Sequence, residues 1–161
     1  MNHIWSPWRM QYISREKKSS SGCIFCHAVD CTDGDENLIV RRVKLAYVIL
    51  NRYPYTSGHV MVVPFEHKPS LVSLDKATLA EIMQLINESL RTIEALYKPE
   101  GFNVGANIGS IAGAGVAEHV HFHVVPRWGG DTNFMTAIGG TRVLPEELSQ
   151  TYQRMKGSWQ A

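Results

Sequence analysis

The stretch EHVHFHVVPRW, residues 118–128, places three of the chain's seven histidines within five positions. His119, His121 and His123 alternate with apolar residues, and alternate side chains of a β-strand point to the same face. The pattern therefore predicts one strand that carries all three imidazoles on one face and packs the other face into the core. At a rise of roughly 3.3 Å per residue, the outer two histidines lie about 13 Å apart, so one metal ion cannot easily bind all three.

A single histidine in such a strand is most simply a partly exposed polar residue. Three in strict alternation favour a chemical role, because a neutral imidazole is a good nucleophile near pH 7 and a good leaving group once phosphorylated. Neighbouring imidazoles can hydrogen-bond phosphoryl oxygens or protonate a departing group. The preceding loop GSIAGAGVA (109–117) is rich in glycine, which lets main-chain N–H groups approach an anion. Together they predict a phosphate site.

Length and composition indicate one ordinary globular domain over residues 1–161, with 44% hydrophobic and 19% charged residues. The net charge of +1 shows no basic field that would recruit nucleic acid. No apolar run approaches the roughly 18 residues that cross a bilayer, and the N-terminus lacks a signal-peptide pattern. Three cysteines, two of them in Cys23-x-x-Cys26, argue against a secreted disulfide framework and for the cytoplasm.

The hydrophobic pattern predicts an α+β fold with an antiparallel sheet of about five strands, one long helix and a short C-terminal helix. Besides the histidine strand, strands are expected at 38–42, 44–51, 58–64 and 102–108. Apolar residues at three- and four-residue steps predict a helix over 75–97, with Asp75 as its N-cap. The shorter helix is expected over 145–156.

The Cys23-Ile-Phe-Cys26 motif is half of a zinc site. Two buried or idle thiols are an equal alternative without further context. A redox pair fits less well, because no βαβ pattern follows the motif.

The run from His119 to Val125 matches the His-φ-His-φ-His-φ-φ signature, where φ is apolar, and ILNRYPYTSGHVMVVP (49–64) fits the accompanying hairpin. On these residues the chain resembles the histidine triad superfamily, which comprises nucleotide-binding hydrolases and transferases. The resemblance covers a core at 22–127, leaving an aromatic N-terminal arm and linker at 1–21 and an extension at 128–161. The flanks IWSPWRMQYI, GFNVGANIG and AEHVHFHVVPRWGGDTNF resemble the bacterial diadenosine tetraphosphate phosphorylase group.

The resemblance implies that His121 is the nucleophile that attacks the α-phosphorus. His123 would contact bridging or phosphoryl oxygens, and His119 would orient and polarise the site unless a metal binds it. Implied nucleotide or phosphate contacts are Asn51, His59, Asn107, the loop residues Gly113, Ala114, Gly115 and Val116, and Arg127. Relatives usually carry Ser, Thr or Gln where this chain has Ala114-Gly115, so backbone N–H groups would replace a side-chain donor.

Relatives with the Cys-x-x-Cys motif complete a zinc site with two histidines, and the matching positions here are His67 and His119. The resemblance thus implies a structural zinc ion held by Cys23, Cys26, His67 and His119. Cys31 is expected to be a bystander, and His27, which directly follows the motif, is the competing ligand.

The leading functional hypothesis is a nucleotidyl transferase that cleaves diadenosine tetraphosphate with inorganic phosphate to ATP and ADP. The first alternative is a hydrolase of dinucleoside polyphosphates or adenosine phosphoramidates on the same scaffold. The second is a nucleotide-binding module without turnover. The resemblance also implies a homodimer or higher homo-oligomer, with the long helix or a sheet edge at the interface.

Overall fold

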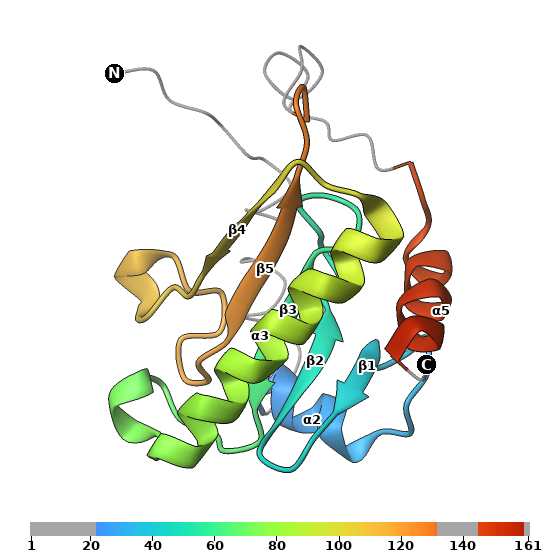
Figure 1. Cartoon of the computed structure of the whole chain (residues 1–161). Helices are drawn as coiled ribbons and strands as arrows, with labels where there is room; N and C mark the ends of the chain where they lie inside the picture. The colour runs from blue at the N-terminus through green and yellow to red at the C-terminus, as the bar shows by residue number, and fades with distance from the viewer. Residues whose placement is uncertain (1–21, 132–144, 160–161) are drawn as a thin grey trace.

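A five-stranded antiparallel sheet forms the centre of the computed structural model, in the order β1-β2-β3-β5-β4 (Figure 1). The structure describes residues 22–131 and 145–159, so the predicted N-terminal arm and much of the C-terminal extension lie outside the described residues. The strands are β1 (Ile39–Arg42), β2 (Ala46–Leu50), β3 (Val60–Pro64), β4 (Gly101–Gly105) and β5 (Phe122–Arg127). The predicted α+β class and antiparallel sheet are confirmed.

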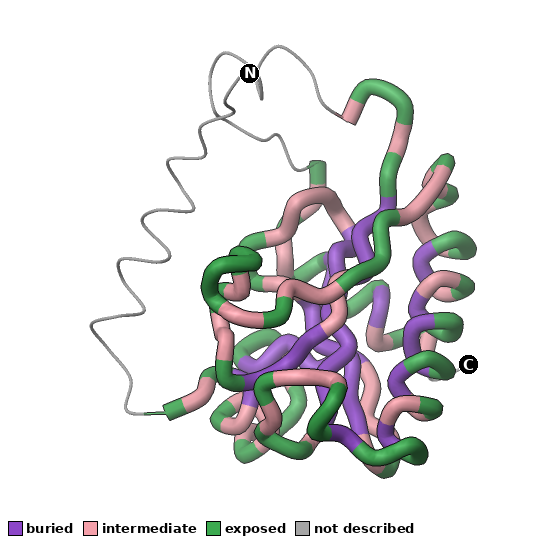
Figure 2. Tube along the Cα trace, turned by 90° about the vertical axis from the view of Figure 1, so that its left-hand side faces the viewer, coloured by how far each residue is buried: buried purple, intermediate pink, exposed green. Residues whose placement is uncertain are grey.

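Two of the three inner strands, β2 and β3, are buried along their whole length. Every residue of β2 and β3 is shielded from solvent, and the buried tube runs through the middle of the molecule in Figure 2. Their sequences, AYVIL and VMVVP, are continuous apolar runs, as strands covered on both faces require. Helix α3 lies in front of the sheet and the short helix α2 (Ile24–Asp30) behind it in Figure 1.

Helix α3 (Lys76–Tyr97) confirms the predicted long helix almost to the residue. The Asp75 side chain accepts a hydrogen bond from the N–H of Thr78 at 2.6 Å, as an N-cap should. The helix ends at Lys98, whose φ of 46° is left-handed. Helix α3 buries one face against β2, β3 and β5. None of the described helices is long and apolar enough to cross a membrane.

The histidine segment departs from the predicted strand. Strand β5 begins only at Phe122, so His119 and His121 lie in the extended chain before it. The reason is that Val120 donates its N–H to the carbonyl of Lys68 at 2.7 Å instead of joining the sheet ladder. The prediction of one strand that carries all three histidines is therefore wrong for His119 and His121, which precede β5 and are buried.

Smaller differences concern the element ends. Helix α5 covers Leu148–Trp159, three residues later than predicted at each end, and β4 stops at Gly105. Helix α2, within which Cys26 lies, and two short 3-10 turns at Leu71–Ser73 and Ser110–Ala112 were not predicted. Seven and three residues are too few to show a helical period.

The Asn37 side chain stabilises the loop between α2 and β1 by hydrogen bonds to its main chain. Its buried amide donates to the carbonyls of Ala28 and Cys31, at 3.0 and 3.3 Å, and its oxygen accepts from the N–H groups of Gly34 and Ile39. These bonds hold Leu38 at the left-handed φ of 61°, with its side chain in the core. The loop thereby fixes α2, and with it the first two cysteines, against the sheet.

Replacing Asn37 by Ala should lower the free energy of unfolding by about 2 kcal/mol, because four main-chain groups lose a buried partner. Urea denaturation of the two proteins measures the difference. The control, Thr32→Ala, changes an exposed side chain of the same loop and should alter stability by less than about 0.5 kcal/mol. Equal stability of N37A and T32A would contradict the anchoring role.

Candidate active site and metal centre

His121 lies buried with one ring nitrogen committed to the main chain. Its Nδ1 is 2.8 Å from the carbonyl oxygen of His119, and because a carbonyl only accepts, Nδ1 carries the proton. The lone pair is therefore on Nε2, the nitrogen that can attack an electrophile. Burial lowers the pKa of His121, against an opposing contribution from the hydrogen bond to His119. The neutral, nucleophilic form is favoured.

His123 belongs to β5 and is joined to His59, which lies at the start of the β3 segment. The two rings meet at 2.9 Å between Nε2 of His59 and Nδ1 of His123. Tyr55, from the loop between β2 and β3, places its ring 4.8 Å from His59 and 6.1 Å from His123, centroid to centroid. The ring of His123 lies 5.1 Å from that of His121. Residues from two distant parts of the sequence thus build one aromatic cluster.

His119 faces away from this cluster towards the cysteines. Its Nε2 is 2.9 Å from the carbonyl oxygen of Pro64, so this nitrogen is the donor and Nδ1 is left unprotonated. Nδ1 lies 3.3 Å from Sγ of Cys23 and 3.7 Å from Sγ of Cys26. His67 adds its Nδ1 at 3.4 Å from Sγ of Cys26. The four ligand atoms all lie within 4.8 Å of one another.

The three sulfur–nitrogen distances of 3.3, 3.4 and 3.7 Å fit a tetrahedral zinc site. Zn–S bonds of about 2.3 Å and Zn–N bonds of about 2.0–2.1 Å place the ligand atoms roughly 3.3–3.8 Å apart. The His119–Pro64 hydrogen bond also fits, since a metal-binding histidine usually donates its other N–H to a carbonyl or carboxylate. Burial and the neighbouring thiol of Cys23 raise the pKa of Cys26; a bound cation acts in the opposite direction. His27 is exposed and is not part of this group.

Phe25 lies against both His119, a candidate metal ligand, and His121, and it was not predicted as a site residue. This ring, 2% exposed, lies 5.4 Å from the His119 ring and 4.8 Å from the His121 ring, centroid to centroid. Its carbonyl oxygen accepts from the hydroxyl of Tyr47 in β2 at 3.0 Å. Phe25 is one of two apolar residues inside Cys-Ile-Phe-Cys, and nothing in that motif indicates which ring it packs against.

The loop before the histidines uses some of its N–H groups internally. Gly113 and Ala114 donate to the carbonyls of Ser110 and Gly109, at 3.0 and 3.3 Å. Gly109 and Gly113 take φ values of 85° and 88°, which favour glycine. Within the described part of the chain, the N–H groups of Gly115 and Val116 donate to no protein acceptor. Of the four loop residues predicted to contact phosphate, these two keep an N–H group that can donate to an anion.

Two other predicted site residues, Asn51 and Asn107, lie near the triad or support the loop before it. Asn51 is close, with Nδ2 3.5 Å from the His59 ring and its side-chain oxygen accepting from the N–H of Tyr53. Asn107 donates to the carbonyl of Gly113 at 3.4 Å and so supports the loop.

Arg127 is not brought to the histidines. It lies four residues beyond His123 along β5, about 13 Å by the strand rise. Its guanidinium binds the side chains of Asn103, at 2.6 Å, and Asp131, at 2.8 Å. Its contact with phosphate stays a prediction.

The model of the HIT domain matches residues 34–130, more than half of the chain. The chain belongs to the histidine triad (HIT) family. As a HIT protein it is 42% identical over 166 aligned residues to AP-4-A phosphorylase of Mycobacterium tuberculosis, covering 99% of this chain and 85% of that one. It is also 31% identical to adenosine 5'-monophosphoramidase hnt1 of Schizosaccharomyces pombe, covering 78% and 90%. The resemblance seen in the sequence is confirmed.

Solved HIT structures share the fold. A histidine triad nucleotide-binding protein of Sulfolobus tokodaii superimposes with a TM-score of 0.69 at 26% identity, covering 86% of this chain and 92% of that one. A Zn-bound histidine triad family protein of Mycobacterium smegmatis gives a TM-score of 0.68 at 24% identity, covering 87% and 94%.

Proposed function

We propose that the protein is a nucleotidyl transferase that cleaves diadenosine tetraphosphate with inorganic phosphate. In the first step Nε2 of His121 forms a bond to the α-phosphorus, the bond to the bridging oxygen breaks, and ATP leaves. In the second step an oxygen of inorganic phosphate attacks the same phosphorus, the P–N bond breaks, and ADP leaves. The observation that carries this proposal is the 42% identity to a phosphorylase along nearly the whole chain.

The site geometry supports the same chemistry. His121 is neutral and holds its lone pair on Nε2, as an attacking imidazole must. The N–H groups of Gly115 and Val116 are available to the phosphoryl oxygens, where preorganised donors stabilise developing charge. Alanine and glycine at 114–115 add no side-chain donor, so the phosphate contacts of this loop are made by the main chain.

Hydrolysis is the second candidate, because one relative with a monophosphoramidase activity is 31% identical. Both reactions use the same nucleophile and the same nucleotidyl-histidine, and they differ only in whether phosphate or water attacks it. The greater identity and coverage of the phosphorylase relative favour phosphorolysis.

A structural zinc ion at Cys23, Cys26, His67 and His119 is the second part of the proposal. The ion would join α2 to the segment that carries the nucleophile, since His119 supplies both the ligand nitrogen and the carbonyl that orients His121. When bound, zinc would supply a structural crosslink, since all four of its ligands would come from the protein. Three reduced cysteines suit a cytoplasmic location.

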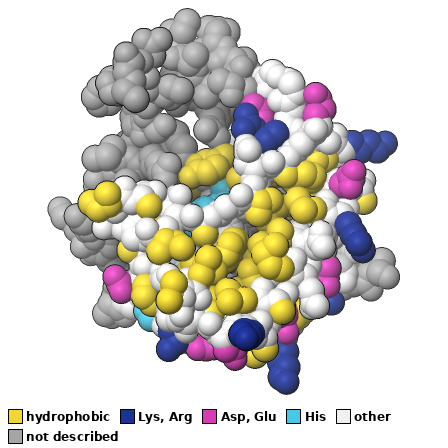
Figure 3. Space-filling model, turned by 60° about the vertical axis from the view of Figure 1, so that its left-hand side comes forward, with side chains coloured by type: hydrophobic (Ala, Val, Ile, Leu, Met, Phe, Trp, Pro, Cys, Tyr) yellow, Lys and Arg dark blue, Asp and Glu magenta, His cyan; other side chains and the backbone are white. Residues whose placement is uncertain are grey.

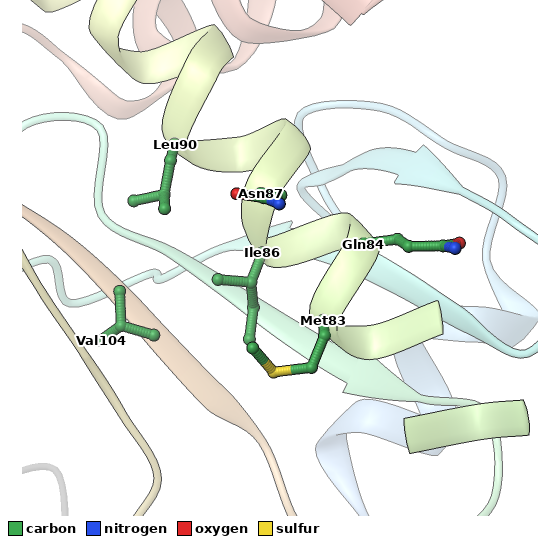
Figure 4. A pocket seen from close by; sticks show the side chains of 6 residues that line it. All are labelled: Met83, Gln84, Ile86, Asn87, Leu90 and Val104. Atoms are coloured by element: carbon green, nitrogen blue, oxygen red, sulfur yellow. The ribbon is translucent and has the colours of Figure 1, made fainter. Parts of the chain in front are cut away.

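A homodimer is the third part. Helix α3 and the edge strand β4 enclose a groove of about 390 Å³, lined by Met83, Gln84, Ile86, Asn87, Leu90 and Val104 (Figure 4). Hydrophobic side chains gather on this face in Figure 3, where Met83 is 58% and Val104 46% exposed. Strand β4 ends the sheet, so a second copy can extend the hydrogen bonding and cover the apolar surface.

Incubation with diadenosine tetraphosphate should yield ATP and ADP only when inorganic phosphate is present, as measured by chromatography of the nucleotides. AMP plus ATP, or two ADP, formed regardless of phosphate would instead identify a hydrolase. Absence of turnover under both conditions would leave a binding module.

Replacement of His121 by Asn should abolish turnover, with a fall in kcat of at least about 10³-fold, because the nucleophile is lost. Nucleotide affinity, measured by calorimetry, should remain within a few-fold. Unchanged turnover in H121N would exclude the nucleotidyl-histidine.

Removal of zinc by a chelator should lower Tm by about 10 °C, since loss of a few kcal/mol shifts a domain of this size by that amount. Cys26→Ser should reduce the zinc content of the purified protein below one ion per chain, whereas Cys31→Ser should retain it. Equal metal content in C26S and C31S would refute the assignment.

Met83→Lys should convert the dimer to a monomer, because a charge at the centre of the apolar groove has no partner. Sedimentation velocity measures the mass, and circular dichroism checks the fold. Val72→Lys is the matched control, because Val72 is 96% exposed and does not line the groove. A dimer in both variants, or a monomeric wild type, would overturn this interface.

A further inference from the structure

His59 is too deeply buried to bind the nucleotide directly. Only 1% of it is exposed, and both of its ring nitrogens have partners in the protein. Nδ1 lies 3.1 Å from the main-chain nitrogen of Tyr55, and Nε2 lies 2.9 Å from Nδ1 of His123. The direct nucleotide contact expected from the sequence is thus replaced by contacts to the loop and to the third histidine of the triad.

These two contacts determine where the protons lie. A main-chain N–H can only donate, so the bond from Tyr55 requires Nδ1 of His59 to be unprotonated. A neutral His59 then carries its proton on Nε2 and donates it to Nδ1 of His123. His123, when neutral, consequently carries its own proton on Nε2. The Asn51 amide nitrogen lies 3.5 Å from both nitrogens of His59, farther than either of the other two partners. The two shorter hydrogen bonds therefore determine the tautomer of His59.

We propose that His59 is a positioning residue that holds His123 in the Nε2–H tautomer. His123 is thereby able to donate a hydrogen bond to the bridging oxygen of the departing ATP. The loop 53–58 determines this state, because the N–H of Tyr55 selects the tautomer of His59. The ring of Tyr55 lies against both imidazoles, and His59, which donates the short bond, is itself buried.

Two neighbouring histidines thereby receive opposite tautomers from their surroundings. The carbonyl of His119 places the proton of His121 on Nδ1, whereas His59 places the proton of His123 on Nε2. The first ring offers a lone pair and the second a donor. When the bond between the α-phosphorus and the bridging oxygen breaks, the electron pair stays on that oxygen, which accepts the hydrogen bond from Nε2 of His123. This inference rests on the proposed transferase for its catalytic consequence, but the tautomers follow from the contacts alone.

Two amide substitutions separate the two bonds of His59. In His59→Gln the amide nitrogen can occupy the place of Nε2 and donate to His123. In His59→Asn the shorter side chain reaches only the place of Nδ1, so the bond to Tyr55 is kept and the bond to His123 is lost. His59→Gln should retain kcat within about tenfold, and His59→Asn should lose about 10²-fold, a typical contribution of a positioned acid. KM should change little in either variant.

The tautomers are measured directly by long-range ¹H–¹⁵N correlation spectra of protein labelled with ¹⁵N-histidine. In the wild type and in His59→Gln, His123 should show its proton on Nε2, and in His59→Asn a mixture of both tautomers. Tyr55→Ala, which keeps the main-chain N–H and removes the ring, should retain the Nε2–H form. A proton on Nδ1 of His123 in the wild type, or an unchanged tautomer in His59→Asn, would overturn the proposal.

The spectra need no turnover, so they distinguish this proposal from the transferase. Correct tautomers without cleavage of diadenosine tetraphosphate would reject the transferase and retain the role of His59 in positioning His123. Cleavage with equal kcat in His59→Gln and His59→Asn would retain the transferase and reject the positioning role.

Discussion

The hydrogen bond between Nε2 of His119 and the carbonyl oxygen of Pro64 positions both the candidate metal site and His121. It turns Nδ1 of His119 towards the thiols of Cys23 and Cys26, and it binds the histidine segment to the end of β3. The main-chain carbonyl of the same residue then fixes the ring of His121. One buried residue, 1% exposed, therefore orients a candidate metal ligand through its ring and the lone pair of His121 through its main-chain carbonyl.

The periodic elements could be predicted from sequence because their patterns are long. Helix α3 repeats its apolar face over 22 residues, and β2 and β3 are unbroken apolar runs. The histidine segment could not be placed correctly, because alternation at 119–123 fits a strand equally well whether or not its N–H groups join the sheet. Only the contact of Val120 with Lys68, 52 positions earlier, decides that question.

The candidate site, too, could be predicted only in part from the sequence. The four residues expected to hold zinc were named by resemblance, and the structure brings their ligand atoms together as a candidate metal site: Cys23, Cys26, His67 and His119. The support of the triad by Phe25, Pro64 and Tyr55 was missed, since it depends on ring packing and main-chain groups that leave no residue-type signal. Arg127 matched the pattern of a phosphate contact, but its guanidinium is occupied by Asn103 and Asp131.

The ligands of the metal centre are far apart in the sequence. Cys23 and His119 are separated by 96 positions, and β5, which continues from the triad, pairs on both sides with strands that precede it. Closing so long a loop costs entropy that is recovered only when the late segment docks. During synthesis, therefore, the thiols and the edge of β3 lack their partners until the histidine segment and β5 have been made. The oriented ring of His121 thus forms only after its own segment, late in the chain, has docked against elements made much earlier.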